Sequence, residues 1–490
     1  MVDISIIVCV HNEGRLFHHS LKSIERSMDY ATKHGLGVEL IIVADNVDSS
    51  TNKYLKENLK QTSKSLNLIH KVSFKDVGLS RNFGINIANA KVITVIDGDD
   101  LMCENWLVEG LKKLQDSEDE KIVHPEYSLY FGSRDLLWKM SDSKTDYFSH
   151  RNSVEINYYC SLMMAYKHTV SKYPYRQTRS EESFGYEDWL WNCDTLFAEV
   201  EHVIAPKTMY AYRVKQHQSR FMTWQNCLIP KTPYFLPKSL GKDSDPNHLD
   251  VANIGHIGIK SKSLANIRSI VNYLFNRLIK PISRRIHPRL EEYSSKMQYE
   301  TLHLFRPVDN KKRNKMPEWL LDEIRSLHEI DYRVFMSEHL QNVIEIYNPQ
   351  PTAFTDAYWE LATEIPQNTD YLILIPFMKN GGAEKLVSNY CKAILNLDSA
   401  KKIIIATTSD DTSPYSAQLD KRISLVKPGP SFFLLDDNEQ ARLISLLTVQ
   451  LTPKKLLLIN SIPGYMAVER FGKAISKNIR RASESRSSTH

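Results

Sequence analysis

The sequence predicts an α/β protein built on a parallel, doubly wound sheet. Over the first 100 residues, short apolar runs typical of buried strands alternate with segments of helical periodicity. The runs end in polar loops, and a parallel arrangement places such loops along one edge of the sheet, where ligands bind. A second series of apolar runs follows residue 370, so we expect two α/β units within the 490 residues.

The first unit is expected to contain four strands, each a short apolar run: Ile4 to Val10, Val38 to Ala44, Leu66 to His70, and Val92 to Ile96. Helical patterns separate them: Leu16 to Met28, a segment through Tyr54 and Leu55, and Leu79 to Ala90. Asp48 or Ser49 is placed to cap the second helix. Because parallel strands end at one edge, Asp45 and Asp48 should lie near the loop after the fourth strand.

That fourth strand stops abruptly at three carboxylates around one glycine, in the run T-V-I-D-G-D-D. Asp97, Asp99 and Asp100 would repel one another there unless a cation lay among them. Mg²⁺ and Mn²⁺ prefer oxygen ligands and leave room for phosphate oxygens. The run therefore predicts a divalent metal site for a nucleotide diphosphate. The alternative is an acidic turn in which Asp and Gly supply the loop conformations.

Three motifs carry a resemblance to a known family: V-C-V-H-N-E-G-R at 8–15, V-A-D-N-V-D-S-S-T at 43–51, and the segment from V-G-L-S-R-N-F-G to V-I-D-G-D-D at 77–100. With them, Met1 to Pro237 resembles the nucleotide-sugar half of a family-2 glycosyltransferase with the GT-A fold. The resemblance implies a nucleotide-binding loop at His11, Asn12 and Glu13, although His11 replaces the aromatic residue common there.

The same resemblance assigns roles to the other loops. Asp45 would recognise a uracil ring, and Arg81 would lie beside the base or the phosphates. Asp97 would contact the ribose and, with Asp99, hold a Mn²⁺ or Mg²⁺ ion. Asp100 would serve either the outer shell of that metal or the loop itself.

A catalytic base is expected later in the chain. Ser183 to Trp191, S-F-G-Y-E-D-W-L-W, resembles the family's ED motif, in which an acidic pair opens a helix beneath the acceptor. Asp188 is expected to deprotonate the acceptor hydroxyl, with Glu187 beside it. The alternative is that both are charges favoured by the dipole of the helix's first turn. Trp189 and Trp191 either pack in the core or form a sugar platform.

Tyr210 to Ser219 resembles the family's closing segment, which returns a basic loop to the diphosphate. His217 would complete the metal shell, and Arg213 or Lys215 would offset phosphate charge. The alternative for His217 is an ordinary surface histidine.

The GT-A domain is expected to occupy residues 1–240, and residues 241–367 are predicted to be a linker and helical connector. Within the connector, Lys260 to Arg289 contains eight Lys or Arg and no acidic residue, with apolar residues at helical spacing. This segment either contacts an anionic membrane or packs on its own catalytic domain with the basic face in solvent.

Residues 368–479 predict a second, Rossmann-like α/β unit, with strands at Tyr371 to Pro376, Lys402 to Thr407, Ile423 to Lys427, and Lys455 to Asn460. The loop with Gly381 and Gly382 resembles the first glycine-rich loop of family-4 glycosyltransferases with the GT-B fold. Only one of the two GT-B domains fits the remaining length, so the resemblance implies an incomplete GT-B half. A disordered tail is expected at 480–490.

Composition narrows the functional class. The net charge of +5 gives no sign of a nucleic-acid partner, and none is expected. The six cysteines have no CxxC or metal-ligand spacing, which is typical of a reducing compartment. The chain starts without a basic-then-apolar leader and has no run of 18 uncharged apolar residues. We therefore expect a cytoplasmic protein, at most peripheral at the inner face of the membrane.

The resemblance implies a metal-dependent, inverting glycosyltransferase that moves a sugar from a UDP-sugar to a glycan or lipid-linked glycan. Surface polysaccharide synthesis, such as that of capsule or O-antigen, is the expected setting. The alternative is a GT-A-like domain without turnover that serves as a scaffold for glycan or partner enzymes. The joint presence of Asp45, Arg81, Asp97, Asp99 and Asp188 favours the enzyme.

Overall fold

The computed structural model describes residues 2–58, 68–133, 136–215, 226–240, 316–334, 345–346, 349, 351–367, 369–379, 381–409 and 419–484. The chain divides into two compact units. The first comprises Met1–Phe235 and Arg313–Gln350, and the second comprises Leu236–Lys312 and Pro351–His490. None of the helices in the described ranges is long and apolar enough to cross a membrane.

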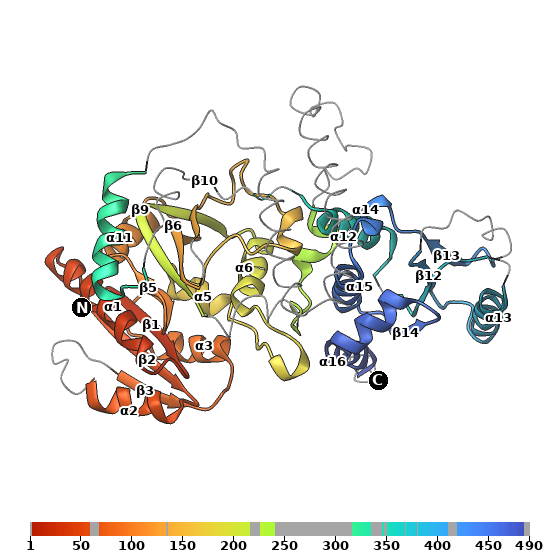
Figure 1. The fold of residues 1–490 in the computed structure, drawn as a ribbon, viewed down its shortest axis with the longest axis horizontal. Helices are drawn as coiled ribbons and strands as arrows, with labels where there is room; N and C mark the ends of the chain where they lie inside the picture. The colour runs from red at the N-terminus through yellow and green to blue at the C-terminus, as the bar shows by residue number, and fades with distance from the viewer. Residues whose placement is uncertain are drawn as a thin grey trace, which may run out of the picture. The chain divides into compact units, whose positions relative to one another are not determined.

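The first unit is built on a mixed sheet (Figure 1). Its described strands follow the order β10-β7-β6-β8-β4-β1-β2-β3, and β9 pairs with β6 and with β5. The strands are β1 Ile4–Val10, β2 Val38–Asp45, β3 Leu68–Val72, β4 Val92–Asp97, β5 Leu101–Met102, β6 Lys121–Gly132, β7 Leu136–Lys139, β8 Met163–Tyr166, β9 Glu201–Val214 and β10 Glu345–Ile346. β3, β2, β1 and β4 run parallel, as predicted. β8 and β6 continue the sheet antiparallel, so the prediction of a wholly parallel sheet is wrong for this part.

Helices cover both faces of the parallel strands. Alternate residues of β1 enter different cores: Val8 packs with α1 (Leu16–Lys33) and α4 (Trp106–Leu114), and Ile7 packs with α3 (Val77–Ile87). Gly84 allows this close approach, because a Cβ there would lie 2.5 Å from Cγ2 of Ile7. The winding leaves the carboxyl ends of β1, β2 and β4 together at one edge.

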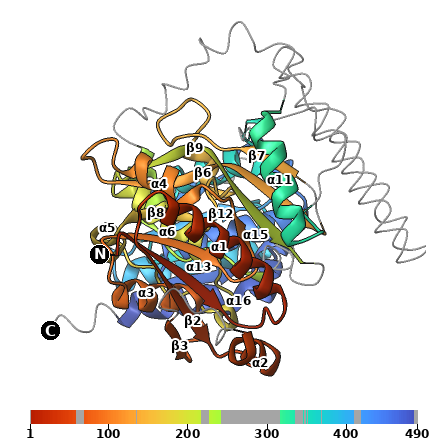
Figure 2. The ribbon, with the colours of Figure 1, turned by 90° about the vertical axis from the view of Figure 1, so that its left-hand side faces the viewer.

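The first unit also contains α2 (Ser49–Asn58), α5 (Lys167–Lys172), α6 (Glu187–Phe197) and α11 (Glu318–Ile330). α11 lies against α1 (Figures 1 and 2), and its stripe of Leu320, Ile324 and Leu327 is buried in the core that α1 helps to form. The predicted connector, residues 241–367, includes the residues of α11. In the structure, residues 313–350 belong to the first unit. The predicted basic segment 260–289 lies outside the described residues.

The second unit contains a parallel sheet in the order β13-β12-β11-β14, which confirms the four predicted strands. Its elements are α12 Ala353–Glu364, β11 Tyr371–Ile375, α13 Gly382–Leu397, β12 Ile403–Thr407, β13 Ile423–Val426, α14 Pro430–Phe433, α15 Asp437–Leu451, β14 Lys455–Leu458 and α16 Ile462–Glu484. α16 extends four residues past Arg480, so the predicted disordered tail is wrong there, and residues 485–490 lie outside the described residues.

A carboxylate of the protein itself, that of Glu384, lies at the glycine-rich loop of the second unit. Gly381 is the N-cap of α13, and a Cβ on it would lie 2.3 Å from Oε2 of Glu384. Glu384 is only 6% exposed, so its carboxylate is held at the start of the helix, where partial positive charge favours it. A diphosphate approaching this loop would meet that negative charge.

Two buried histidines join the central strands of the first unit. Nε2 of His124 on β6 lies 2.9 Å from Nδ1 of His202 on β9, and Nε2 of His202 lies 3.0 Å from Oγ1 of Thr195. The ring of Tyr159 stacks on His124 with centroids 4.4 Å apart. Burial lowers the pKa of His124 to about 3 and holds the pKa of His202 well below its ordinary value.

Acid should therefore destabilise the first unit. Histidine in an unfolded chain titrates near pH 6.5, so below that pH the unfolded state binds protons that the buried pair does not. The free energy of unfolding should fall by about 1 kcal/mol per histidine for each pH unit between pH 6 and 5. Urea unfolding at pH 7, 6 and 5 measures this, and His124→Gln should flatten the dependence. The exposed His168→Gln is the control; equal slopes in the two variants would contradict the assignment.

Candidate active site

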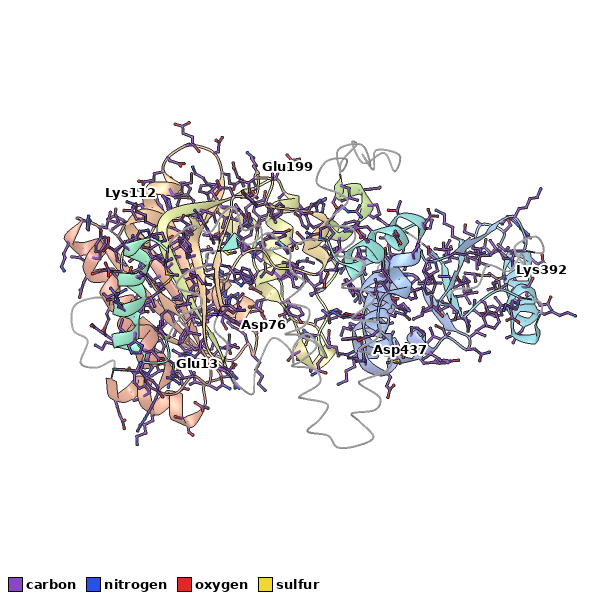
Figure 3. The ribbon with its side chains drawn as sticks, turned by 45° about the horizontal axis from the view of Figure 1, so that its top comes forward. Glu13, Asp76, Lys112, Glu199, Lys392 and Asp437 are labelled. Atoms are coloured by element: carbon purple, nitrogen blue, oxygen red, sulfur yellow. The ribbon has the colours of Figure 1, made fainter. Side chains whose placement is uncertain are left out.

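The ends of β1, β2 and β4 open into a cleft of about 1230 Å³ that β9 and the start of α6 also line. Glu13 and Asp76, both labelled in Figure 3, belong to its wall. Asn12 is exposed and is not among the lining residues, and His217 lies outside the described residues. The cleft brings together eight predicted site residues: His11, Glu13, Asp45, Arg81, Asp97, Asp99, Glu187 and Asp188.

Asp45, at the end of β2, organises the start of α3. Its carboxylate accepts hydrogen bonds from the backbone N–H of Lys75 (3.0 Å) and of Asp76 (3.1 Å), and from Oγ of Ser80 (2.9 Å). A carboxylate offers about four lone pairs, so roughly one remains for a ligand. Asp45 is 6% exposed and lines the cleft, which fits a contact with one N–H of a base.

Hydrogen bonds tie the loop after β1 to the loop after β2. Nδ1 of His11 lies 2.8 Å from the carbonyl oxygen of Asp45, and the backbone N–H of Asp48 donates to the carbonyl of His11 at 3.1 Å. The Asp48 side chain accepts from the N–H of Thr51 at 2.7 Å, which confirms it as a cap of α2. Asp48 is not among the lining residues of the cleft.

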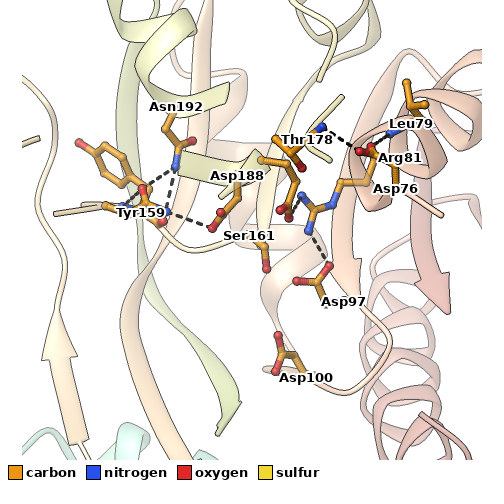
Figure 4. Close-up of polar contacts among 12 residues, drawn as sticks. Asp76, Leu79, Arg81, Asp97, Asp100, Tyr159, Ser161, Thr178, Asp188 and Asn192 are labelled. Atoms are coloured by element: carbon orange, nitrogen blue, oxygen red, sulfur yellow. Dashed lines mark hydrogen bonds and ion pairs between the residues drawn. The ribbon is translucent and has the colours of Figure 1, made fainter. Parts of the chain in front are cut away.

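Arg81 joins the two acidic motifs from within the protein (Figure 4). Its guanidinium donates to Oδ1 of Asp97 at 2.6 Å and to Oε1 of Glu187 at 3.0 Å. It also lies 5.2 Å from the ring centre of Tyr175, and the arginine is 1% exposed. Burial opposes its charge, but the two carboxylates hold its pKa above the ordinary range. Arg81 therefore fixes the distance between the strand end and the helix start.

Gly98 lets the acidic loop pass close to β1. Its N–H donates to the carbonyl oxygen of Cys9 at 3.1 Å, and a Cβ on Gly98 would lie 2.8 Å from that oxygen. Any side chain here would push the loop away from the strand. The glycine thus sets the direction in which Asp97 and Asp99 leave β4.

Asp100 anchors the loop to β9. One carboxylate oxygen accepts from the backbone N–H of Arg213 at 2.7 Å, and the other accepts from the hydroxyl of Tyr210. Asp100 is 1% exposed, and burial, followed by the charges of Asp99 and Asp97, raises its pKa well above its ordinary value. Of the two roles left open by the sequence, these contacts favour the loop itself.

Asp97 and Asp99 carry donors of the kind that a divalent metal prefers. Asp97 is paired through Oδ1 with Arg81, and Oδ2 of Asp99 lies 2.7 Å from Nζ of Lys215. Each keeps a second carboxylate oxygen without a partner among the described residues. Those residues contain no group of three His, Cys, Asp or Glu that could hold a metal. Two carboxylates alone do not complete the shell of a Mg²⁺ or Mn²⁺ ion, so an ion held here would need further oxygen ligands from other molecules.

Glu187 and Asp188 open α6 directly after Tyr186, whose φ of 66° is left-handed. Oδ2 of Asp188 accepts from the Asn157 amide at 3.0 Å, and Oδ1 of Asn157 accepts from Asn192 at 3.0 Å (Figure 4). Burial raises the pKa of Glu187, and the neighbouring guanidinium opposes that rise. Glu187 is thus paired with Arg81, while Asp188 lines the cleft with one carboxylate oxygen bound by the Asn157 amide.

The two tryptophans of this helix are buried. Trp191 is 2% exposed, stacks on Tyr175 at 4.9 Å, and donates to the carbonyl of Tyr173 at 2.6 Å. Trp189 is 5% exposed and donates to the carbonyl of Ser153 at 3.0 Å. Trp191 belongs to the core, and Trp189 is among the residues that line the cleft.

Residues 5–173 match the profile of Glycosyl transferase family 2. A curated relative, Glycosyltransferase GlyG of Streptococcus pneumoniae serotype 4 (strain ATCC BAA-334 / TIGR4), is 20% identical over 125 residues. That alignment covers 26% of this chain and 39% of the relative, so the chain spans well under half the length of the curated relative it matches.

Solved structures of TarS from S. aureus are also similar to this chain. TarS 1-349 has 10% sequence identity and a TM-score of 0.34, covering 74% of this chain and 87% of that one. Its complex with UDP-GlcNAc has 10% identity and a TM-score of 0.36 over the same shares. The structure of TarS itself has 12% identity and a TM-score of 0.35, covering 65% and 56%.

Proposed function

We propose that this chain is a metal-dependent, inverting glycosyltransferase, which the family match over residues 5–173 and the curated glycosyltransferase relative support. The donor is a nucleotide diphosphate sugar of the UDP class, and the acceptor is a hydroxyl of a glycan or lipid-linked glycan in surface polysaccharide synthesis. The observation that carries the proposal is the convergence in one cleft of the Asp97–Asp99 loop and the Glu187–Asp188 helix start, joined by Arg81.

In this proposal the donor lies along the ends of β1, β2 and β4. Asp45 accepts an N–H of the base, and Asp97 contacts the ribose. A metal bound by Asp97 and Asp99 would neutralise negative charge on the departing diphosphate. Lys215, 2.7 Å from Asp99, adds a positive charge on the same side of the cleft.

Asp188 acts at the other end of the site. It accepts the proton of the acceptor hydroxyl as that oxygen attacks the anomeric carbon. The bond from this carbon to the diphosphate breaks as the new glycosidic bond forms, so the configuration inverts. The Asn157 amide, 3.0 Å from Oδ2 of Asp188, orients the carboxylate.

For the second unit we propose a GT-B-type half that has no donor site of its own. The carboxylate of Glu384 at the start of α13 supports this, because it disfavours a diphosphate at the loop of Gly381. The donor would then be held by the first unit alone.

A nucleotide-release assay tests the proposed function. The full chain is incubated with a panel of UDP-sugars and GDP-sugars, with and without Mn²⁺, and nucleotide release is followed. We expect one UDP-sugar to be turned over in the presence of the metal. If no nucleotide is released from any of these sugars and the chain still binds glycan, the enzyme hypothesis is wrong and the scaffold hypothesis takes its place.

Asp99→Asn should remove metal-dependent turnover. The change keeps the size of the side chain but removes the charge that the cation needs, and a metal supplies several kcal/mol to such a transition state. We expect kcat/KM with Mn²⁺ to fall by about 100-fold or more. Asp119→Asn, an exposed position of the same unit, is the control. Equal turnover in the two variants would end the metal assignment.

A further inference from the structure

Arg213, near the end of β9, contacts the acidic loop Asp97–Asp100. Its Nε donates to the carbonyl oxygen of Asp99 at 2.7 Å, and its backbone N–H donates to Asp100 at 2.7 Å. Its guanidinium lies 4.5 Å from the ring centre of Phe131, and the residue is 5% exposed. Arg213 thus contacts two residues of the loop that carries the predicted metal ligands, Asp99 through its side chain and Asp100 through its backbone N–H.

The guanidinium of Arg213 pairs with Asp331, a residue of the first unit that comes much later in the chain. Nη1 of Arg213 lies 2.7 Å from Oδ2 of Asp331, the residue that follows α11. Asp331 is 1% exposed and also accepts from Nε of Arg333 at 2.9 Å. Burial acts to raise the pKa of Asp331, but hydrogen bonds from Arg333 and the charge of Arg213 lower it to about 2. The pair is therefore charged at neutral pH.

The body of the unit fixes the position of Asp331. Arg26 on α1 pairs with Glu323 on α11, and Nδ1 of His19 lies 2.6 Å from the carbonyl oxygen of Ile330. The backbone N–H of Asp331 itself donates to the carbonyl of Leu327 at 2.9 Å. Because α11 is held near its middle through Glu323 and at its C-terminal end through Ile330, the position of the Asp331 carboxylate beside Arg213 is fixed.

We propose that Asp331 is a positioning residue of the transferase: by holding Arg213, it keeps the Asp97–Asp100 loop in the conformation that presents Asp97 and Asp99 to the donor. This rests on the proposed function of the cleft. Without the Asp331 charge, the guanidinium of Arg213, whose Nε already donates to the carbonyl oxygen of Asp99, would be drawn toward the carboxylates of the loop and would compete with the metal for them.

The test compares Asp331→Asn with Asp322→Asn, the same change on the exposed side of α11, where Asp322 pairs only with Arg325 among the described residues. Hydrogen exchange is read on the peptide of residues 97–103. UDP binding with Mn²⁺ is measured by calorimetry, and KM for the donor is measured separately from kcat. For Asp331→Asn we expect exchange of this peptide to be faster by about tenfold and UDP binding to be weaker by about tenfold, since small displacements of a positioned group carry such losses. Asp322→Asn should match the wild type.

A lower melting temperature with unchanged exchange and unchanged UDP affinity would overturn the proposal and leave Asp331 a purely structural residue. If Asp331→Asn does not fold, Arg213→Lys tests the same link, because it keeps the charge beside Asp331 and removes the Nε donor to Asp99; wild-type exchange in that variant would likewise overturn it. Failure of the proposed function is seen separately, as a wild-type chain that binds no nucleotide, and the exchange result still decides whether Asp331 holds the loop.

Discussion

Asp188→Asn is expected to lower kcat by about 10²- to 10⁴-fold, the usual contribution of a general base, with UDP binding close to that of the wild type. The asparagine preserves the size of the side chain and the contact with Asn157, which lies 3.0 Å from Oδ2, but it cannot take the proton of the acceptor. Single-turnover kinetics with saturating donor measures the chemical step directly.

Asp194→Asn is the matched control on the same helix. Asp194 pairs with Arg176 at 2.6 Å and does not line the cleft. Its replacement should lower stability without changing kcat in the folded enzyme. If donor affinity fell in Asp188→Asn and kcat did not, Asp188 would be a positioning residue and Glu187 would become the candidate base.

The second large effect is expected for Arg81→Met. Removing the buried guanidinium leaves the partly exposed carboxylates of Asp97 and Glu187 without their common counterion, and breaking a buried ion pair from one side costs about 3–5 kcal/mol, which is an upper range for carboxylates that line a cleft. Activity should be lost together with stability, because both acidic motifs lose their common anchor. The loss of stability should be smaller at pH 5 than at pH 8, since protonation of a carboxylate relieves the repulsion.

Arg176→Met provides the comparison, because Arg176 also binds a carboxylate with two nitrogens but is 42% exposed in its side chain. Exposed pairs contribute about 1 kcal/mol or less. Urea unfolding of both variants at pH 5 and pH 8 measures the difference. Adding Glu187→Gln to Arg81→Met should restore part of the stability, and equal losses in the two single variants would contradict the bridging role.

The sequence predicts the elements that obey a local rule. β1, β2 and β4 are continuous apolar runs that end in polar loops, so their positions and parallel pairing follow from periodicity and from the crossover rule. The capping role of Asp48 follows from its place before a helical pattern. Both features depend on residues that are close in the chain or repeat along it.

The rest depends on contacts between distant segments. Arg81 meets Glu187 across 106 residues, and no spacing in the chain encodes that pairing. The apolar stripe of α11 predicts that one face of this helix is buried, but it does not identify the surface that covers that face. For this reason the sequence alone predicts α11 as part of the connector. Tyr210 donates to Asp100, and the sequence around it shows only the alternation Y-A-Y-R along β9. That alternation predicts a strand but does not predict that Tyr210 binds Asp100.

The division of the chain between the units has a consequence for how the protein is made. The first unit needs residues 313–350, yet it is interrupted by residues 236–312 of the second. During synthesis on the ribosome, Arg213 therefore has no Asp331 to pair with until residue 331 has emerged. The contact between α1 and α11 closes a loop of about 300 residues, and it also forms late in synthesis. A nascent chain stopped before α11 would hold every acidic residue of the cleft and still lack the helix that completes its core, so the first unit completes its core only after residues 316–334 have been translated.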